Sequence, residues 1–139
     1  EDYHDVPEIY IDRSRLMQII VNLLQNAKDA LLEDSSGKAE KQIIITTKIS
    51  EDDSSKILLV VEDNGVGISQ ENIAKIFGYG FSTKKHGHGI GLHSSAISAS
   101  ELGGKLRMES DGVGKGARFI LELPLTEELL TGVKNVTIK

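Results

Sequence analysis

The feature that most constrains the fold of this 139-residue chain is a long run of apolar residues at helical spacing. These residues are Leu16, Ile19, Ile20, Leu23, Ala27, Ala30 and Leu31. Because they recur every three or four residues, they predict a helix of about four turns with one buried face. Asp12 or Ser14 can cap its start, and the segment 8–11, after Pro7, is predicted to be a short strand. A helix with one apolar face needs a second layer of structure to cover that face.

Four later segments are predicted to be strands that supply this second layer. They span residues 42–49, 56–62, 105–109 and 117–123. The first is rich in β-branched residues, and the second is an apolar run that we expect to be buried on nearly both faces. The turn at 110–116 joins the last two into a hairpin, and Pro124 ends the final strand.

Two further helices are predicted at 71–77 and 90–102, and Gly103-Gly104 ends the second of them. Its inward positions are expected to be Leu92, Ala96, Ile97 and Ser100. Helices and strands in this order predict an α+β fold in which the helices cover one face of a mixed sheet.

The composition fits one globular domain over residues 1–139, with a core at about 7–125 and a polar tail at 126–139. A formal net charge of −5 argues against a nucleic-acid partner, which would require a basic surface. The chain has no cysteine, which excludes disulfides and thiolate zinc sites and suits a cytoplasmic protein. No apolar run reaches the length of a membrane span, and no signal peptide opens the chain. We expect this chain to be a piece of a longer parent protein, and that parent protein can be anchored in a membrane.

The first group of chemically interesting residues lies on the long predicted helix. Asn22, Asn26 and Asp29 follow one another at i, i+4 and i+7, beside the apolar face. An asparagine carbonyl oxygen is a hard, neutral ligand that suits Mg²⁺. The alternative is an ordinary solvated helix face, which also gathers polar residues on one side.

The second group is Asp63-Asn64-Gly65-Val66-Gly67, directly after the predicted buried strand. The Asp63 carboxylate can accept a hydrogen bond from an exocyclic amino group such as that of adenine. Gly65 and Gly67 lack Cβ atoms, so a flat base can lie against the backbone. The alternative is a plain turn, because Asn-Gly is a favoured turn dipeptide.

The third group is the glycine-rich segment 87–92, Gly-His-Gly-Ile-Gly-Leu, which leads into a predicted helix. Alternate glycines allow backbone N–H groups to approach phosphate oxygens at a helix N-terminus. Hydroxyls and cations precede it at Ser82, Thr83, Lys84, Lys85 and His86. The alternative is a flexible loop with solvated charges. The segment is neither a P-loop nor a Rossmann fingerprint, and its histidines have no neighbouring ligands for a metal. No nucleophile elbow surrounds Ser94 and Ser95, which disfavours a triad hydrolase.

The order of five motifs resembles the ATP-binding domain of bacterial sensor histidine kinases. They are NLLQNAKDA at Asn22–Ala30, DNGVGI at Asp63–Ile68, FGYGFSTK at Phe77–Lys84, GHGIGL at Gly87–Leu92 and GKGARFILELP at Gly114–Pro124. That domain belongs to the superfamily of DNA gyrase, heat-shock chaperones and MutL, and the resemblance is greatest to kinases of the nitrogen-regulator and oxygen-sensor type. It implies the Bergerat fold, a two-layer α/β sandwich with a mixed, mostly antiparallel sheet.

The resemblance also implies roles for individual residues. Asn26 resembles the Mg²⁺ ligand, Asn22 a catalytic polar residue near the phosphates, and Asp63 the adenine-binding carboxylate. The lid would span 77–88, with Lys84 as a catalytic phosphate contact. The remaining ATP-binding positions would be Asp29, Gly65, Gly67, Ile68, Ser82, Thr83, Gly87, His88, Gly89, Gly91 and Leu92.

Two departures from the family pattern matter. Ala117 stands where many members have a threonine whose hydroxyl supports adenine binding, so that contact is in doubt. The chain also has no helix with a phosphoacceptor histidine. We therefore expect transfer of the ATP γ-phosphoryl group to a histidine on separate dimerisation helices of the same protein, with a response regulator downstream and this piece monomeric.

Three other functions remain open from the sequence. Hydrolases of the gyrase, chaperone and MutL type resemble one another in a glutamate that activates water four residues before the Mg²⁺-binding asparagine. That position is Asn22 here, and an amide cannot act as a base at neutral pH. A non-catalytic nucleotide-binding module and a serine or mitochondrial-type protein kinase on the same fold are the other two alternatives.

Overall fold

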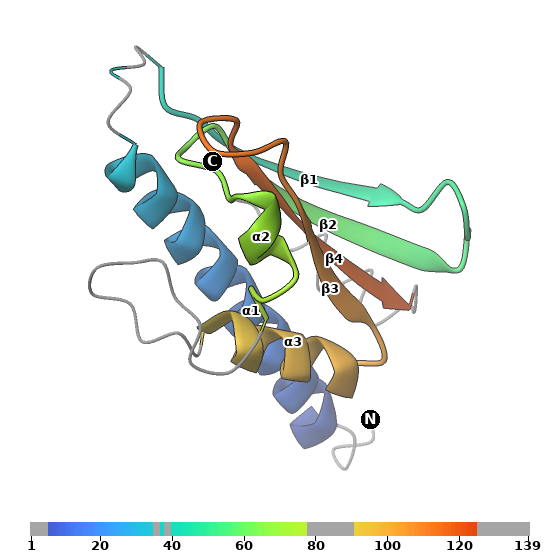
Figure 1. The fold of residues 1–139 in the computed structure, drawn as a ribbon. Coiled ribbons are helices and arrows are strands. Elements are labelled where there is room, and N and C mark those ends of the chain that lie inside the picture. The colour runs from blue at the N-terminus through green and yellow to red at the C-terminus, as the bar shows by residue number, and fades with distance from the viewer. Residues whose placement is uncertain (1–5, 35–36, 38–39, 78–90, 125–139) are drawn as a thin grey trace.

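The computed structural model describes residues 6–34, 37, 40–77 and 91–124, with side chains from Arg13 onward. The described chain forms two layers, a set of helices and a sheet (Figure 1). The helices are α1 (Val6–Glu33), α2 (Gln70–Ile73) and α3 (Gly91–Glu101). The strands are β1 (Ile43–Ile49), β2 (Lys56–Asp63), β3 (Lys105–Glu109) and β4 (Ala117–Pro124).

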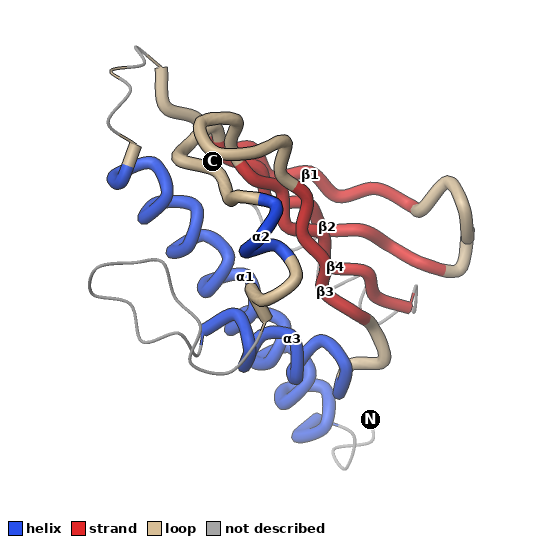
Figure 2. Tube along the Cα trace, viewed as in Figure 1, coloured by secondary structure: helices blue, strands red, loops and turns tan. Residues whose placement is uncertain are grey.

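The four described strands form one sheet in the order β1-β2-β4-β3, and every neighbouring pair is antiparallel. The three described helices lie on the same side of it (Figure 2). The predicted two-layer α/β sandwich is therefore confirmed. The strand bounds agree with the sequence prediction to within about one residue, as expected for strands with clear apolar patterning. The helix predicted at 71–77 is shorter than expected and ends at Ile73.

The core lies between the helices and the inner face of the sheet. Alternate residues of the two central strands point into it, because side chains alternate across a strand. The inward residues are Ile57, Leu59 and Val61 of β2 and Phe119, Leu121 and Leu123 of β4, and they pack against Leu16, Ile19, Leu23 and Ala27 of α1. The predicted apolar stripe of α1 is therefore confirmed, and each fully buried aliphatic side chain contributes about 1.5–3 kcal/mol to folding.

The prediction of a strand at 8–11 is wrong. Helix α1 already begins at Val6, so that segment forms its first turns. Asp12 and Ser14 consequently lie inside the helix and are not its caps. Pro7 does not prevent this, because the first N–H groups of a helix have no intrahelical partner and proline is tolerated in the first turn.

The predicted inward face of α3 is partly wrong. Ser95 and Ala99 are the buried residues of this helix, whereas Ile97 is 47% exposed and Ser100 is exposed. Positions 92, 95 and 99 are spaced as one helical face, and that face packs on α1. The small residues at 95 and 99 allow the two helices to approach closely, which outweighs burial of the larger Ile97.

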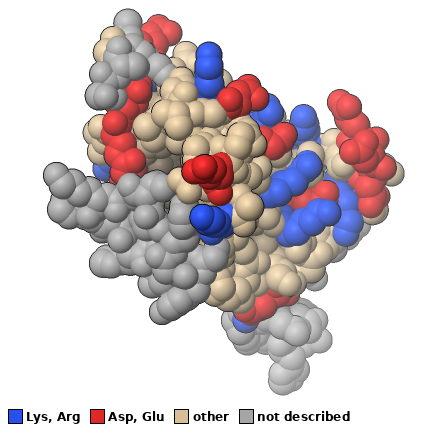
Figure 3. All heavy atoms as spheres, in the orientation of Figure 1, with Lys and Arg blue, Asp and Glu red and all other residues tan. Residues whose placement is uncertain are grey.

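The outer face of the sheet carries charged side chains. Arg118 of β4 lies 3.6 Å from Glu62 of β2 and 3.6 Å from Glu109 of β3, which makes a cross-strand ion-pair ladder. Acidic and basic side chains are interspersed over the strands in the space-filling view (Figure 3). No helix among the described residues has the length and apolarity required to cross a membrane.

Candidate functional site

A polar stripe on α1 forms the first part of the candidate site. Asn22 and Asn26 are both half-buried, one turn apart, next to the buried face of the helix. The Asn22 side-chain amide donates a hydrogen bond to the Ser95 hydroxyl of α3 (3.0 Å). The Asn26 side chain makes no hydrogen bond to any other described residue. Its carbonyl oxygen is therefore not used by the described fold and fits the kind of ligand that Mg²⁺ prefers.

Asp29 differs from the two asparagines. Its carboxylate accepts a hydrogen bond from the exposed Gln25 side chain, one turn earlier on the same helix (3.1 Å). Asp29 thus has a partner within α1, and a direct part in ligand binding stays a prediction. No group of three or more His, Cys, Asp or Glu side chains suited to a metal occurs in the described ranges. A metal here would draw on amide oxygen, phosphate and water.

The turn Asp63–Ile68, which we call the β2 turn, forms the second part. Asp63 is only 5% exposed although it is a carboxylate. One of its oxygens, Oδ1, accepts the backbone N–H of Gly65 (2.8 Å). This hydrogen bond fixes the orientation of the Asp63 carboxylate at the C-terminal end of β2. Ala117 lies directly opposite Asp63 in the register with β4 and is buried, so its methyl group stands beside the carboxylate with no hydroxyl to offer.

The β2 turn lies against the C-terminal part of α1. The Val66 N–H donates to the Ala30 carbonyl (3.1 Å). A Cβ atom on Gly65 would lie 2.6 Å from the carbonyl carbon and oxygen of Ala30 and 2.9 Å from the Leu31 nitrogen. Only glycine fits this approach of two backbones. Asp63 therefore belongs to the β2 turn and Asn26 to α1, and these two elements meet at Ala30, one helical turn after Asn26.

Gly65→Ala is expected to lower the free energy of unfolding by about 1–3 kcal/mol, because the new methyl group would overlap rigid backbone atoms of α1. Urea denaturation measures this change. Gly91→Ala is the matched control, since no atom of the described residues lies within 4 Å of its Cβ position and its φ is not positive. If both variants unfold at the same urea concentration as the unsubstituted domain, the close approach of the two backbones is not as described.

Ser95 is a residue that the sequence analysis missed as a part of the site. It is 1% exposed, and its hydroxyl is the hydrogen-bond partner of Asn22. The sequence feature that could have indicated this role is its position, since Leu92, Ser95 and Ala99 are spaced as one helical face and Ser95 is the polar residue on it. Because a buried hydroxyl requires a partner, Ser95 holds the Asn22 amide in one orientation.

Asn22→Ala and Ser95→Ala are each expected to destabilise the domain by about 0.5–1.5 kcal/mol, the usual net contribution of one hydrogen bond. The double variant is expected to cost less than the sum, because the second substitution removes a partner that is already absent. A double-mutant cycle of unfolding free energies measures this coupling. Strictly additive effects would show that the two side chains do not interact.

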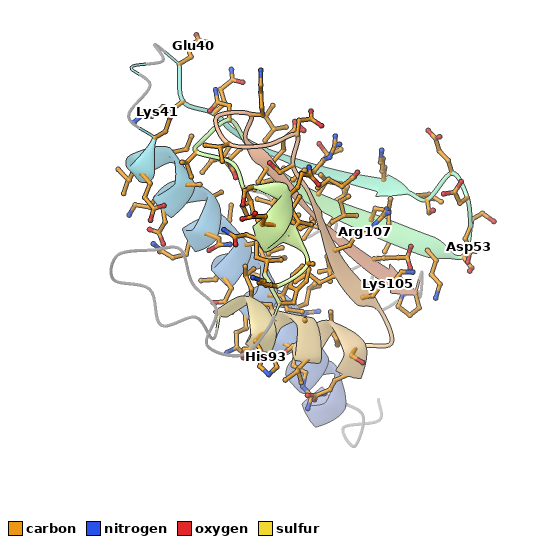
Figure 4. The ribbon with its side chains drawn as sticks, viewed as in Figure 1. Glu40, Lys41, Asp53, His93, Lys105 and Arg107 are labelled. Carbon is orange, nitrogen blue, oxygen red and sulfur yellow. The ribbon has the colours of Figure 1, made fainter. Side chains whose placement is uncertain are left out.

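Gly91 and Leu92 begin α3, as the glycine-rich motif predicts. His93, which follows on α3, is labelled in Figure 4. Its ring nitrogen Nδ1 lies 3.0 Å from the Phe77 carbonyl oxygen, and this contact joins α3 to the chain after α2. The two described ends of the segment 78–90 are thus held near each other. The predicted site residues Ser82, Thr83, Lys84, Gly87, His88 and Gly89 lie outside the described residues, and their roles stay predictions.

A hollow of about 310 Å³ opens on the outer face of the sheet, close to the β2 turn. The charged residues that line it are four carboxylates and two cations: Glu62, Asp63, Glu109, Asp111, Lys115 and Arg118. Arg118 already lies between Glu62 and Glu109, and the carboxylates outnumber the cations, so this hollow offers no net positive charge to a phosphate. The polar stripe of α1 is on the opposite, helix-covered side of the sheet, and we place the candidate site there.

Comparison with known proteins identifies the class of protein to which this chain belongs. Residues 11–127 match the family model described as "Histidine kinase-, DNA gyrase B-, and HSP90-like ATPase". Sensor protein CitS of Halalkalibacterium halodurans is 42% identical over 113 residues, covering 81% of this chain and 20% of that protein. Sensor protein FixL of Bradyrhizobium diazoefficiens is 31% identical over 120 residues, covering 86% and 22%. The solved catalytic domain of histidine kinase ThkA is 32% identical with a TM-score of 0.64, covering 80% of this chain and 66% of that one.

The chain therefore belongs to the histidine kinase-, DNA gyrase B- and HSP90-like ATPase family, and within it to the ATP-binding catalytic domains of sensor histidine kinases. It spans about a fifth of the length of the curated relatives it matches.

Proposed function

We propose that this domain binds ATP with Mg²⁺ and transfers the γ-phosphoryl group to a histidine on separate dimerisation helices. The observation that carries the proposal is the joining of three elements around one polar stripe. Asn22 is bonded to α3, and the β2 turn with Asp63 is packed on α1 just beyond Asn26. The Asp63 carboxylate, the amides of Asn22 and Asn26 and the start of α3 are thus carried by elements that contact one another.

The β2 turn is the proposed binding surface for the base. The buried Asp63 carboxylate is oriented by the Gly65 N–H and can accept a hydrogen bond from the adenine amino group. Gly65, Gly67 and Ile68 would border the base. The two glycines let this turn pack closely against the backbones of Ala30 and Gly112, which holds its atoms in place beside the base. Guanine has a carbonyl oxygen at that ring position, which would face the carboxylate unfavourably, so the site should prefer adenine.

The polar stripe of α1 is the proposed side for the phosphates. Asn26 would hold Mg²⁺ through its side-chain oxygen, together with phosphate oxygens and water. When bound, Mg²⁺ would neutralise charge that develops on the phosphates. Asn22 is directed by Ser95 toward the same helix face. Lys84, Ser82 and Thr83 would add charge and hydroxyls, and Gly87, His88, Gly89, Gly91 and Leu92 would contribute backbone N–H groups at the start of α3.

Phosphoryl transfer to a histidine fits this set of residues better than hydrolysis. Transfer depends on positioning and charge neutralisation, and the acceptor imidazole is itself a nucleophile. Hydrolysis would require a base to activate water. Asn22 cannot serve, since its amide donates a hydrogen bond to Ser95 and does not accept protons at neutral pH.

The partners follow from this reaction. We propose that the phosphoacceptor histidine lies on dimerisation helices of the same protein, and that a response regulator receives the phosphoryl group afterwards. The chain would act as one domain over residues 1–139, monomeric by itself and located in the cytoplasm, with its parent protein anchored in a membrane or free of it.

The test is to incubate the domain with ATP labelled in the γ-phosphate, Mg²⁺ and a fragment that carries the phosphoacceptor helices of its own parent protein. The expected result is acid-labile label on that fragment, and none on a variant whose acceptor histidine is glutamine. Release of labelled phosphate without labelled fragment would favour the hydrolase. Neither product from a domain that binds ATP would favour a non-catalytic module.

A further inference from the structure

We propose that Ser110, in the turn between β3 and β4, is a positioning residue for nucleotide binding, acting through the β2 turn. It would touch neither nucleotide nor metal. The inference rests on the proposed function, in which the β2 turn binds the base of the nucleotide. No sequence motif singled out Ser110, which the sequence analysis assigned only to a hairpin turn.

The Ser110 hydroxyl is fully used by the backbone around it. It accepts the N–H groups of Ile68 (3.2 Å) and Gly112 (3.2 Å) and donates to the Gly116 carbonyl (2.6 Å), with the Gly112 carbonyl a more distant acceptor at 3.3 Å. A serine hydroxyl has one proton to donate and two lone pairs to accept with. Its capacity is therefore filled by backbone groups of the β2 turn and of both ends of its own hairpin turn.

Backbone contacts reinforce this connection. The Gly114 N–H donates to the Val66 carbonyl (2.6 Å), and the Gln70 side-chain amide donates to the Ser110 carbonyl (3.3 Å). The turn between β3 and β4 and the turn after β2 lie side by side (Figure 1). The two turns are thus linked by hydrogen bonds at Val66 and Ile68, and Gln70 of α2 adds a third link to the hairpin turn.

Glycines permit the two turns to touch. Gly67 has a positive φ of 71°, and a Cβ atom there would lie 2.2 Å from the Gly112 carbonyl oxygen. A Cβ atom on Gly116, whose φ is 75°, would lie 2.2 Å from the Asp63 carbonyl oxygen. The hairpin turn therefore supports the β2 turn on the side away from Ala30, and Ser110 is the side chain that bonds the two backbones together.

The consequence for binding is preorganisation. A base that lies against Gly65 and Gly67 needs those backbone atoms in fixed positions, and ordering a loose turn on binding lowers affinity. Without the Ser110 hydroxyl, the Ile68 N–H loses its partner and the turn gains freedom. The Asp63 carboxylate keeps its bond to the Gly65 N–H, so the loss should be partial.

The test compares Ser110→Ala, Ser110→Thr and the control Ser55→Ala. Ser55 also carries a hydroxyl bonded within a turn, to Asp53, but at the opposite end of the sheet. We expect Ser110→Ala to speed amide hydrogen exchange at Ile68 and Gly112 in the nucleotide-free domain by about tenfold, the effect of losing one hydrogen bond of ordinary strength. Core amides of β2 should exchange as before.

The second measurement is calorimetric titration with the β,γ-imido analogue of ATP and Mg²⁺. Ser110→Ala should raise Kd by about tenfold, Ser110→Thr should restore both exchange and Kd because it keeps the hydroxyl, and Ser55→Ala should change neither. Unchanged Ile68 exchange, an unchanged Kd, or an equal rise in exchange at every core amide would overturn the positioning role. If the unsubstituted domain itself fails to bind, the proposed function fails, and the role of Ser110 in binding fails with it. The exchange data then still decide whether Ser110 holds the β2 turn.

Discussion

Asp63→Asn is expected to weaken binding of the imido analogue of ATP by about 10- to 100-fold, the effect of opposing two donors at a buried site that requires an acceptor. The substituted amide oxygen can still accept the Gly65 N–H, as the carboxylate does at 2.8 Å. Its NH₂ group would then take the position from which the carboxylate meets the adenine amino group. The turn should keep its shape while the recognition is lost.

The control for this variant is Glu62→Gln, which makes the same chemical change one residue earlier. Glu62 points to the outer face of the sheet, where it pairs with Arg118. It should leave Kd unchanged, since exposed ion pairs have small effects. Calorimetric titration of both variants decides the matter. An Asp63→Asn domain that is folded and binds with unchanged Kd would remove Asp63 from the site.

Asn26→Ala is expected to abolish the dependence of nucleotide affinity on Mg²⁺ while leaving the fold intact. The Asn26 side chain makes no hydrogen bond to the other described residues, so its loss should cost little stability. Alanine is also the better helix former, by about 0.5 kcal/mol. Titration of the ATP analogue with and without Mg²⁺, together with urea denaturation, measures both properties.

Gln18→Ala is the matched control for Asn26→Ala, because it truncates an exposed amide side chain earlier on the same helix. That variant should keep the Mg²⁺ dependence of the unsubstituted domain. An Asn26→Ala domain whose affinity still rises with Mg²⁺ would show that the metal is held by other groups.

The parts of the fold that the sequence predicts well are those with strong periodicity. The buried stripe of α1 has helical spacing, and the apolar run of β2 is marked as a strand by its short length and its β-branched residues. The candidate site was predictable for a related reason. Asn22, Asn26 and Asp63 stand next to such patterns, so their places follow once the helix and the strand are assigned.

The errors arise where the surrounding structure overrides a local preference. The segment 8–11 has strand-like residues but forms the first turns of α1, because a helix extends more easily than it begins. Ile97 is exposed because the small Ser95 and Ala99 are the buried residues of α3. Ser110 could not be predicted as part of the site. Its partners Ile68 and Gly116 are brought to it by the fold, and no local pattern marks a hydroxyl that bonds two separate turns.

Adenine recognition by this domain is tested most directly by calorimetric titration of the purified domain with the imido analogue of ATP plus Mg²⁺, and with the matching analogue of GTP. We expect saturable one-to-one binding of the adenine nucleotide and much weaker binding of the guanine nucleotide, since the Asp63 carboxylate accepts a hydrogen bond that only adenine donates there. Equal affinity for both would contradict recognition of the base by Asp63. No binding by the folded domain would contradict the proposed nucleotide site as a whole.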